Sequence, residues 1–162
     1  MKTIVLTYHN GGFGPTEHFY EERLTIGKRG VDFYRKWEIN REENREERDL
    51  LIKPRIDFDD PFEPEPKTDF SWKCEPAEPM RERCASAIAE ILYSIVLENL
   101  IEDLNNQVCD GDSMEVRILM DNDDRIEFDV CWCSLPSKYK QAVRKELAKI
   151  VPAAIPLPAF LR

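Results

Sequence analysis

The sequence predicts an α+β fold: an antiparallel sheet with two helices packed on one face. Three observations lead to this prediction. They are short segments of alternating apolar and polar residues, two segments with apolar residues at helical spacing, and turn residues between neighbouring strands. We expect an N-terminal three-stranded meander, a fourth strand and a C-terminal hairpin. The chain has 162 residues, which fits a single domain over 1–162.

Three strands are predicted near the N-terminus. Residues 2–8 are rich in Thr, Ile, Val, Leu and Tyr, which favour strands. Residues 27–30 read Gly-Lys-Arg-Gly, a tight turn, and apolar residues then alternate over 31–39. Because short turns join antiparallel neighbours, these segments form a meander. In the middle strand, within 17–26, four alternating residues share one side: Tyr20, Glu22, Leu24 and Ile26.

Residues 40–69 break this regular pattern. They hold eleven acidic and six basic residues, a local net charge of -5, together with four prolines. A connection of this length inside a compact domain is usually functional or disordered. We therefore expect an exposed, acidic, proline-rich excursion from the domain.

The remaining elements follow from spacing. Residues 70–74 alternate as a fourth strand, and apolar residues recur at helical spacing over 80–106. Residues 116–120 and 126–132 are predicted to form a hairpin, and Pro136 to begin a second helix. The apolar residues of the proline-rich tail are expected to lie over the core. The side chains predicted to be largely buried are Trp37, Trp72, Phe128, Trp132, Ile88, Ile91, Leu92 and Ile95.

Composition and charge limit the partners. The net charge is -9 and the pI about 4.9, which disfavours direct binding to nucleic acid or anionic lipid. The apolar N-terminal run is too short for a signal peptide, and charged residues interrupt the longest apolar stretch, residues 88–104. These features predict a cytoplasmic protein that does not enter a membrane. Five cysteines, an odd number, fit reduced thiols better than a disulfide framework.

Cys131 and Cys133 offer a possible metal site. If residues 126–132 are a strand, both thiols lie on the face opposite to Trp132. Zinc needs two further ligands, for which the candidates are Cys74, Cys84, Cys109, His9 and His18. None of them forms a second closely spaced pair. A structural zinc module is therefore an alternative, and small buried thiols are the simpler interpretation.

Enzyme chemistry has little support in the sequence. Only His9 and His18 could act as imidazole bases, and no family signature surrounds a cysteine. The glycines of 11–14 are followed by a strand rather than a helix, so they do not make a phosphate-binding loop. Phe13 in this segment is instead a candidate contact residue. An enzyme with an unidentified site remains a further alternative.

The function predicted first is that of a small protein-interaction module of the inhibitor, immunity or adaptor type. Clustered carboxylates can occupy a cationic surface on a partner and speed association with it. The simpler alternative is that the charge only solvates the loop. We expect a basic protein partner and no cofactor. The candidate binding residues are Phe13, Glu42, Glu43, Glu46, Glu47, Asp57, Asp59, Asp60 and Glu63.

Overall fold

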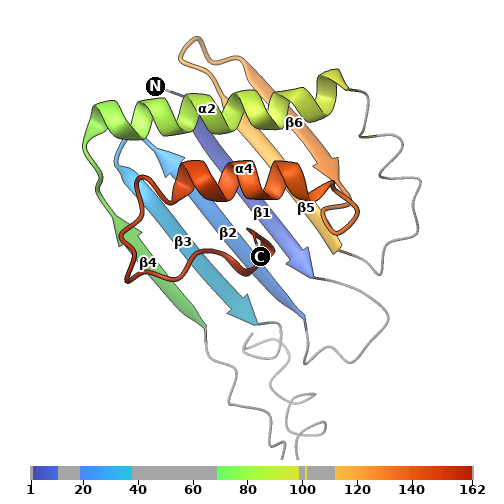
Figure 1. Cartoon of the computed structure of the whole chain (residues 1–162), viewed down its shortest axis with the longest axis horizontal. Helices are drawn as coiled ribbons and strands as arrows, with labels where there is room; N and C mark the ends of the chain where they lie inside the picture. Colours follow the sequence, from blue (N-terminus) through green and yellow to red (C-terminus); the bar gives the residue numbers. More distant parts are fainter. Residues whose placement is uncertain (1, 11–18, 38–68, 99–100, 102–111, 162) are drawn as a thin grey trace, which may run out of the picture.

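The computed structural model describes residues 2–10, 19–37, 69–98, 101 and 112–161. These residues form a six-stranded antiparallel sheet with two helices on one face, and the C-terminal tail crosses that same face (Figure 1). The α+β prediction is confirmed. The sheet's other face carries no helix of the described residues, and we call it the uncovered face.

The strand order is β4-β3-β2-β1-β5-β6. β1 is central, with Leu6 opposite Leu24 of β2 on one side and opposite Val116 of β5 on the other. The sequence predicted the meander and the hairpin, and the structure shows that β1 joins them into one sheet. The strands span Thr3–Asn10 (β1), Tyr20–Gly27 (β2), Gly30–Trp37 (β3), Phe70–Cys74 (β4), Asp112–Leu119 (β5) and Arg125–Val130 (β6).

Helix α2 spans Glu78–Leu97 and α4 spans Ser137–Leu147. A proline lies in the first turn of α2, and Pro136 is the N-cap of α4, as the sequence indicated. The predicted end of the first helix, near residue 106, lies outside the described residues. Among those described, no helix is both long enough and apolar enough to span a membrane. The stripe of α2 that packs on the core contains Cys84, Ala85, Ile88, Ala89, Leu92 and Ile95.

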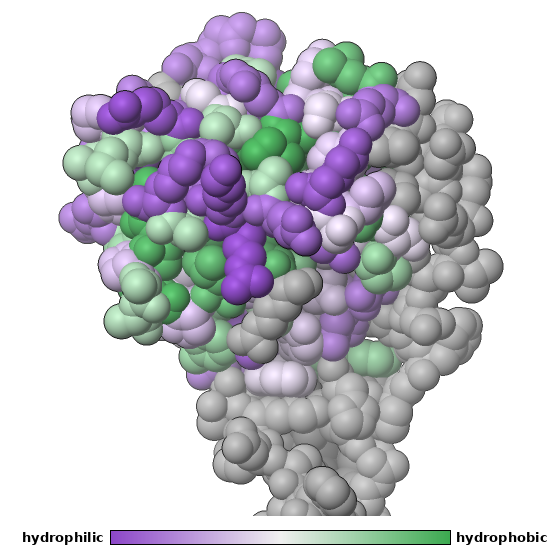
Figure 2. Space-filling view, in the orientation of Figure 1, coloured by the Kyte–Doolittle hydropathy of each residue, from purple (hydrophilic) through white to green (hydrophobic). Residues whose placement is uncertain are grey.

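The tail after α4 ends in a short 3-10 helix, η5 (Ala159–Leu161), in which Phe160 and Leu161 are buried. Trp132 is buried beside it, and its indole Nε1 donates to the carbonyl oxygen of Phe160 at 2.7 Å. Figure 2 shows the surface of this helix-covered side as purple charged groups with green apolar patches between them. The tail therefore closes the core instead of extending into solvent.

The predicted burial of four large aromatics is only partly correct. Trp132 is 1% exposed, whereas Trp37, Trp72 and Phe128 are half-buried. Trp72 and Phe128 lie on the edge strands β4 and β6, where a neighbouring strand covers one side only. Trp37 is the last residue of β3. Alternation predicts which face a side chain is on but not how far the helices extend over that face.

A hydrogen bond from α2 and the conformation of one glycine fix the turn between β2 and β3. The guanidinium of buried Arg81 in α2 donates to the carbonyl oxygens of Pro76 at 2.8 Å and Lys28 at 2.5 Å. Gly30 has a φ of 149°, a conformation that residues with a side chain rarely adopt. A Cβ there would lie 2.6 Å from the carbonyl oxygen of Cys74. Gly30 is therefore required for β4 to pair with β3.

We expect Gly30→Ala to destabilise the domain by about 1–3 kcal/mol, because the new Cβ is both strained and in contact with backbone. Gly27→Ala is the matched control, since its Cβ would meet nothing closer than 3.7 Å. Urea unfolding of both variants measures the difference. Equal stabilities for the two variants would contradict this account of the turn.

Candidate functional site

Five strand ends lie together at one end of the sheet. Asn10 at the end of β1 is opposite both Tyr20 and Asp112, and Tyr20 is opposite Trp37 at the end of β3. Phe70, the first residue of β4, is opposite Arg35, which is two residues before the end of β3. We call this end, at the bottom of the sheet in Figure 1, the loop end. The segments 11–18, 38–68 and 102–111 all connect to it.

Two hydrogen bonds fix the bases of two of these segments. The Asn10 side chain accepts a hydrogen bond from the backbone N–H of Tyr20 at 2.6 Å through Oδ1. The Oδ1 of Asp69 accepts one from the backbone N–H of Trp37 at 2.7 Å. The points where 11–18 and 38–68 leave and rejoin the sheet are therefore held in place by side chains.

Three aromatic rings pack together at the loop end. The ring centroids of Tyr8 and Tyr20 are 6.0 Å apart, and those of Tyr20 and Trp37 are 4.9 Å apart. The Tyr8 hydroxyl donates to Oδ2 of Asp112 at 2.8 Å. Burial, and then this hydrogen bond, raise the pKa of Tyr8, and burial also raises the pKa of Tyr20. Both phenols therefore stay protonated, and Tyr8 acts as a donor that holds the start of β5.

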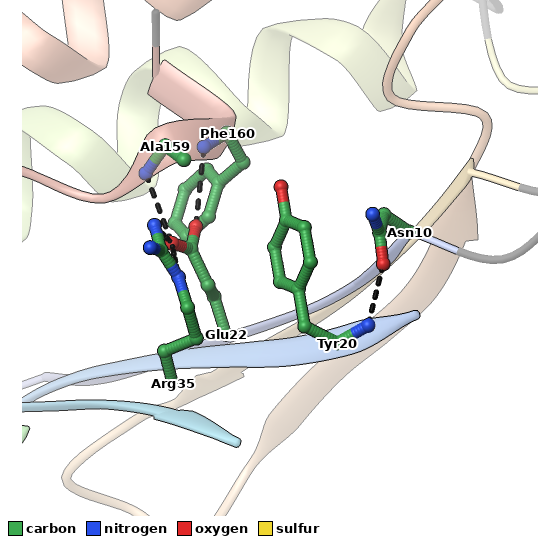
Figure 3. Close-up of polar contacts among 6 residues, drawn as sticks. All are labelled: Asn10, Tyr20, Glu22, Arg35, Ala159 and Phe160. Atoms are coloured by element: carbon green, nitrogen blue, oxygen red, sulfur yellow. Dashed lines mark hydrogen bonds and ion pairs between the residues drawn. The ribbon is translucent and has the colours of Figure 1, made fainter. Parts of the chain in front are cut away.

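Beneath these rings, the carboxylate of Glu22 is completely buried. It is directly opposite Arg35 in the sheet, and the guanidinium of Arg35 donates to Oε1 through Nε at 2.8 Å and through Nη2. The backbone N–H groups of Ala159 and Phe160 donate to Oε1 at 3.1 Å and to Oε2 at 3.2 Å (Figure 3). Glu22 thus binds the start of η5, where unpaired N–H groups favour an anion.

Arg35 connects this anchor to the loop end. The carbon at the centre of its guanidinium lies 5.1 Å from the ring centroid of Tyr20 and 4.8 Å from that of Phe70. Such cation–π contacts stabilise the positions of the Tyr20 and Phe70 rings. With Glu22 accepting four hydrogen bonds, its carboxylate is occupied by structural partners. The Glu22–Arg35 pair therefore holds the rings of Tyr20 and Phe70 in one aromatic platform.

We expect Glu22→Gln to reduce stability by about 3–5 kcal/mol, because the amide leaves the Arg35 charge without its buried counterion. The tail should also become easier to cleave with carboxypeptidase. Glu21→Gln is the control, since Glu21 lies on the opposite face and is partly exposed. Thermal unfolding and digestion of both variants test this. A Glu22→Gln protein as stable as Glu21→Gln would show that the carboxylate does not anchor the tail.

The predicted binding residues all belong to segments that begin and end at the loop end. Phe13 is in 11–18. All of these residues lie outside the described part of the chain, so the structure shows only the strand ends between which they are inserted. The acidic ones, all within 38–68, are Glu42, Glu43, Glu46, Glu47, Asp57, Asp59, Asp60 and Glu63.

A cleft on the uncovered face of the sheet has no signal in the sequence. It has a volume of about 940 Å³ and lies over β2, β3 and β4. Asp32, Ser71 and Lys73 are among the residues that line it, and the ammonium of Lys73 is 3.1 Å from the Asp32 carboxylate. Alternation along β3 and β4 predicts that these side chains share one face of the sheet. Their position beside an edge strand follows only from the strand order.

Cys131 and Cys133 are not on a strand, because β6 ends at Val130; Cys131 follows it directly and Cys133 lies in the turn after it. Cys131 is buried, Cys133 is exposed, and their sulfur atoms are 3.4 Å apart. Cys131 is disulfide-bonded, so the expectation of reduced thiols is wrong for this residue. Zinc binding here would require Cys131 to be reduced first.

Other candidate ligands are dispersed or outside the described residues. Among the residues described, no group of three or more His, Cys, Asp or Glu side chains could hold a metal ion. The Nδ1 of His9 lies 3.6 Å from a carboxylate oxygen of Glu21, on the uncovered face. Cys109 and His18 lie outside the described residues. The zinc module and the enzyme therefore remain predictions from the sequence.

Thiol reactivity should differ sharply between cysteines. Burial, and then the nearby Glu146 carboxylate, raise the pKa of Cys84 to about 12, whereas Cys133 is exposed. At pH 8 only about one Cys84 in ten thousand is then a thiolate, the form that reacts. We expect iodoacetamide to alkylate Cys133 well before Cys84 in the folded protein, with peptide mass spectrometry as the readout. Equal rates in the folded protein would contradict the burial of Cys84, and equal rates in urea are the control.

No protein-family model matches this chain, and no curated protein matches its sequence.

Proposed function

We propose that the chain is a protein-interaction module that binds a basic surface of another protein through the acidic segment 40–69. The observation that carries the proposal is the convergence of strand ends. The segments that contain Phe13 and the acidic residues start and finish at adjacent positions on one end of the sheet. Loops that are held by a rigid scaffold are the usual place for binding residues.

The length of the β3–β4 connection supports this proposal. Two residues, Lys28 and Arg29, suffice to join β2 to β3. β3 and β4 are also adjacent antiparallel strands, yet residues 38–69 join them. Sheet topology does not require so long a connection, and connections of this size are commonly functional. Its base is closed by the contact between Asp69 and Trp37.

The charge of the segment indicates the kind of partner. Its net charge of -5 is more than half of the chain's -9. Concentrated negative charge accelerates association with a cationic surface and rejects anionic ones. An inhibitor, immunity or adaptor protein that covers a basic surface fits this arrangement. Phe13, inserted at the same end, would add an apolar contact at the edge of that surface.

We place this activity in the cytoplasm. Three cysteines, Cys74, Cys84 and Cys133, are free thiols, which is the usual state in a reducing compartment, whereas the disulfide at Cys131 argues for an oxidising one. A module of this kind needs no cofactor and no membrane. Its specificity would come from the shape of the loop end, and its association rate from the charge of residues 40–69.

Neutralising the charge without deleting the segment gives the sharpest test. We expect the four changes Glu42→Gln, Glu43→Gln, Glu46→Gln and Glu47→Gln, made together, to lower the retention of basic proteins from a lysate by about ten-fold or more. Added salt should weaken capture by the unaltered chain in the same way.

The matched control removes four negative charges elsewhere, through Glu75→Gln, Glu78→Gln, Glu90→Gln and Asp123→Asn, all at exposed positions. This variant should retain the same proteins as the unaltered chain. If both variants lose capture equally, net charge rather than the segment is responsible. If neither loses it, the proposed binding segment is wrong.

A further inference from the structure

Helix α4 carries more positive charge than the described residues around it neutralise. Lys138 lies 3.5 Å from Glu98, and Lys149, just beyond the helix, lies 2.6 Å from Glu146. We call the cations of α4 that form no ion pair with a described residue the α4 cations; they are Lys140, Arg144 and Lys145. In a chain whose net charge is -9, they make a local cationic surface that attracts acidic groups.

An apolar groove adjoins the α4 cations. It has a volume of about 360 Å³ and is lined by the end of α4 and by the tail that turns back beside it (Figure 1). Arg144 and Ala148, which are one helical turn apart, form its α4 side. The tail contributes alanine, proline and aliphatic side chains from 151–161, so Arg144 is the only charged residue lining the groove in the described part of the chain. The groove therefore suits an apolar side chain that has an acidic neighbour.

Hydrogen bonds hold the tail side of this groove in place. The backbone N–H of Ile155 donates to the carbonyl oxygen of Pro152 at 2.9 Å. Further along the tail, Glu22 accepts hydrogen bonds from two backbone N–H groups of η5 and so attaches the tail to the sheet. A surface that is already held in one shape loses less entropy when it binds a partner.

Residues 56–63, within the acidic segment 40–69, have the complementary chemistry. They read Ile-Asp-Phe-Asp-Asp-Pro-Phe-Glu, with four acids, three large apolar side chains and no base. Phe58 has an aspartate on each side, so one short stretch offers a ring for the groove and carboxylates for the α4 cations. At about 360 Å³, the groove is large enough for a phenylalanine side chain.

We propose that residues 56–63 of one copy of this chain bind the groove and the α4 cations of a second copy. Phe58 fills the groove, and the aspartates beside it pair with Arg144 and Lys145. Both cations are exposed in the folded chain, so we assign the contact to a second copy rather than to the same chain. This inference rests on the proposed function, because it names a second copy as a basic partner of the same acidic segment.

The contact can be exchanged between two copies. Each copy offers one acidic segment and one basic helix, so two reciprocal contacts about a two-fold axis use both surfaces and close the assembly at a dimer. The opposite charges set the rate and the salt dependence of association. The ring of Phe58 in the groove acts as the buried anchor of each contact.

Charge reversal tests the pairing. We expect sedimentation velocity over a dilution series to show a dimer for the unaltered chain, and added salt to dissociate it. The α4 variant carries Arg144→Glu and Lys145→Glu, and the segment variant carries Asp59→Lys and Asp60→Lys. Each alone should dimerise about ten-fold more weakly or not at all, because like charges then meet. Mixing the two variants should restore a dimer, because each segment then meets a helix of opposite charge.

The matched control makes the same change of charge elsewhere, through Lys28→Glu and Arg83→Glu, both at exposed positions. This control should dimerise as the unaltered chain does. A chain that is monomeric at every concentration, a dimer that survives the α4 variant, or a mixture that fails to recover although both variants fold by circular dichroism would each overturn the proposal.

A labelled peptide tests the groove itself. A synthetic peptide of residues 54–66 with an N-terminal fluorophore should bind the segment variant, whose own segment does not compete, in fluorescence anisotropy measurements. Phe58→Ala in the peptide, or Ala148→Trp in the chain, should weaken binding about ten-fold or more, because the ring is lost or its groove is filled. Ala154→Trp is the control, since Ala154 is exposed and is not among the residues that line the groove. Absent binding, or equal effects of the two tryptophans, would contradict the assigned groove.

Capture of basic proteins from a lysate separates this inference from the proposed function. The α4 variant keeps the whole acidic segment and should still retain those proteins while it no longer dimerises. If the unaltered chain captures basic proteins but is monomeric, this inference alone fails. If the chain forms a dimer with the expected charge dependence but captures no other protein, the second copy is its partner and the wider proposal fails.

Discussion

The buried carboxylate of Glu22 is the contact on which the arrangement of the site depends. Removing a charge from water is costly unless it is paired and fully hydrogen-bonded. Glu22 meets that condition with one cross-strand arginine and two backbone N–H groups of the tail. The interaction therefore links three parts of the chain: the middle of the sheet, the C-terminal tail, and, through Arg35 and its ring contacts, the loop end. Breaking it would release the tail and loosen the aromatic platform together.

The described residues give the sheet two kinds of surface. On the covered face, side chains of β1, β2, β3 and β5 form the core with α2 and α4. On the uncovered face, Val5 and Thr7 of the central strand are buried, whereas charged side chains nearer the edge stay in contact with solvent and compensate one another, as Lys73 and Asp32 do. The core on the covered face therefore supplies the stability of the sheet.

Local patterns predicted the fold well because the elements are short and regular. The alternation of Tyr20, Glu22, Leu24 and Ile26 placed a glutamate among core residues, and the structure confirms that position. The reason for a charge there could not be read from the sequence, since its tail partners lie 137 and 138 residues away. The placement of Cys131 and Cys133 on a strand was wrong, because alternation continues past Val130 although the ladder stops there. The acidic residues of the candidate site could be named from composition alone. That their segment is inserted at one end of the sheet could be seen only from the strand order.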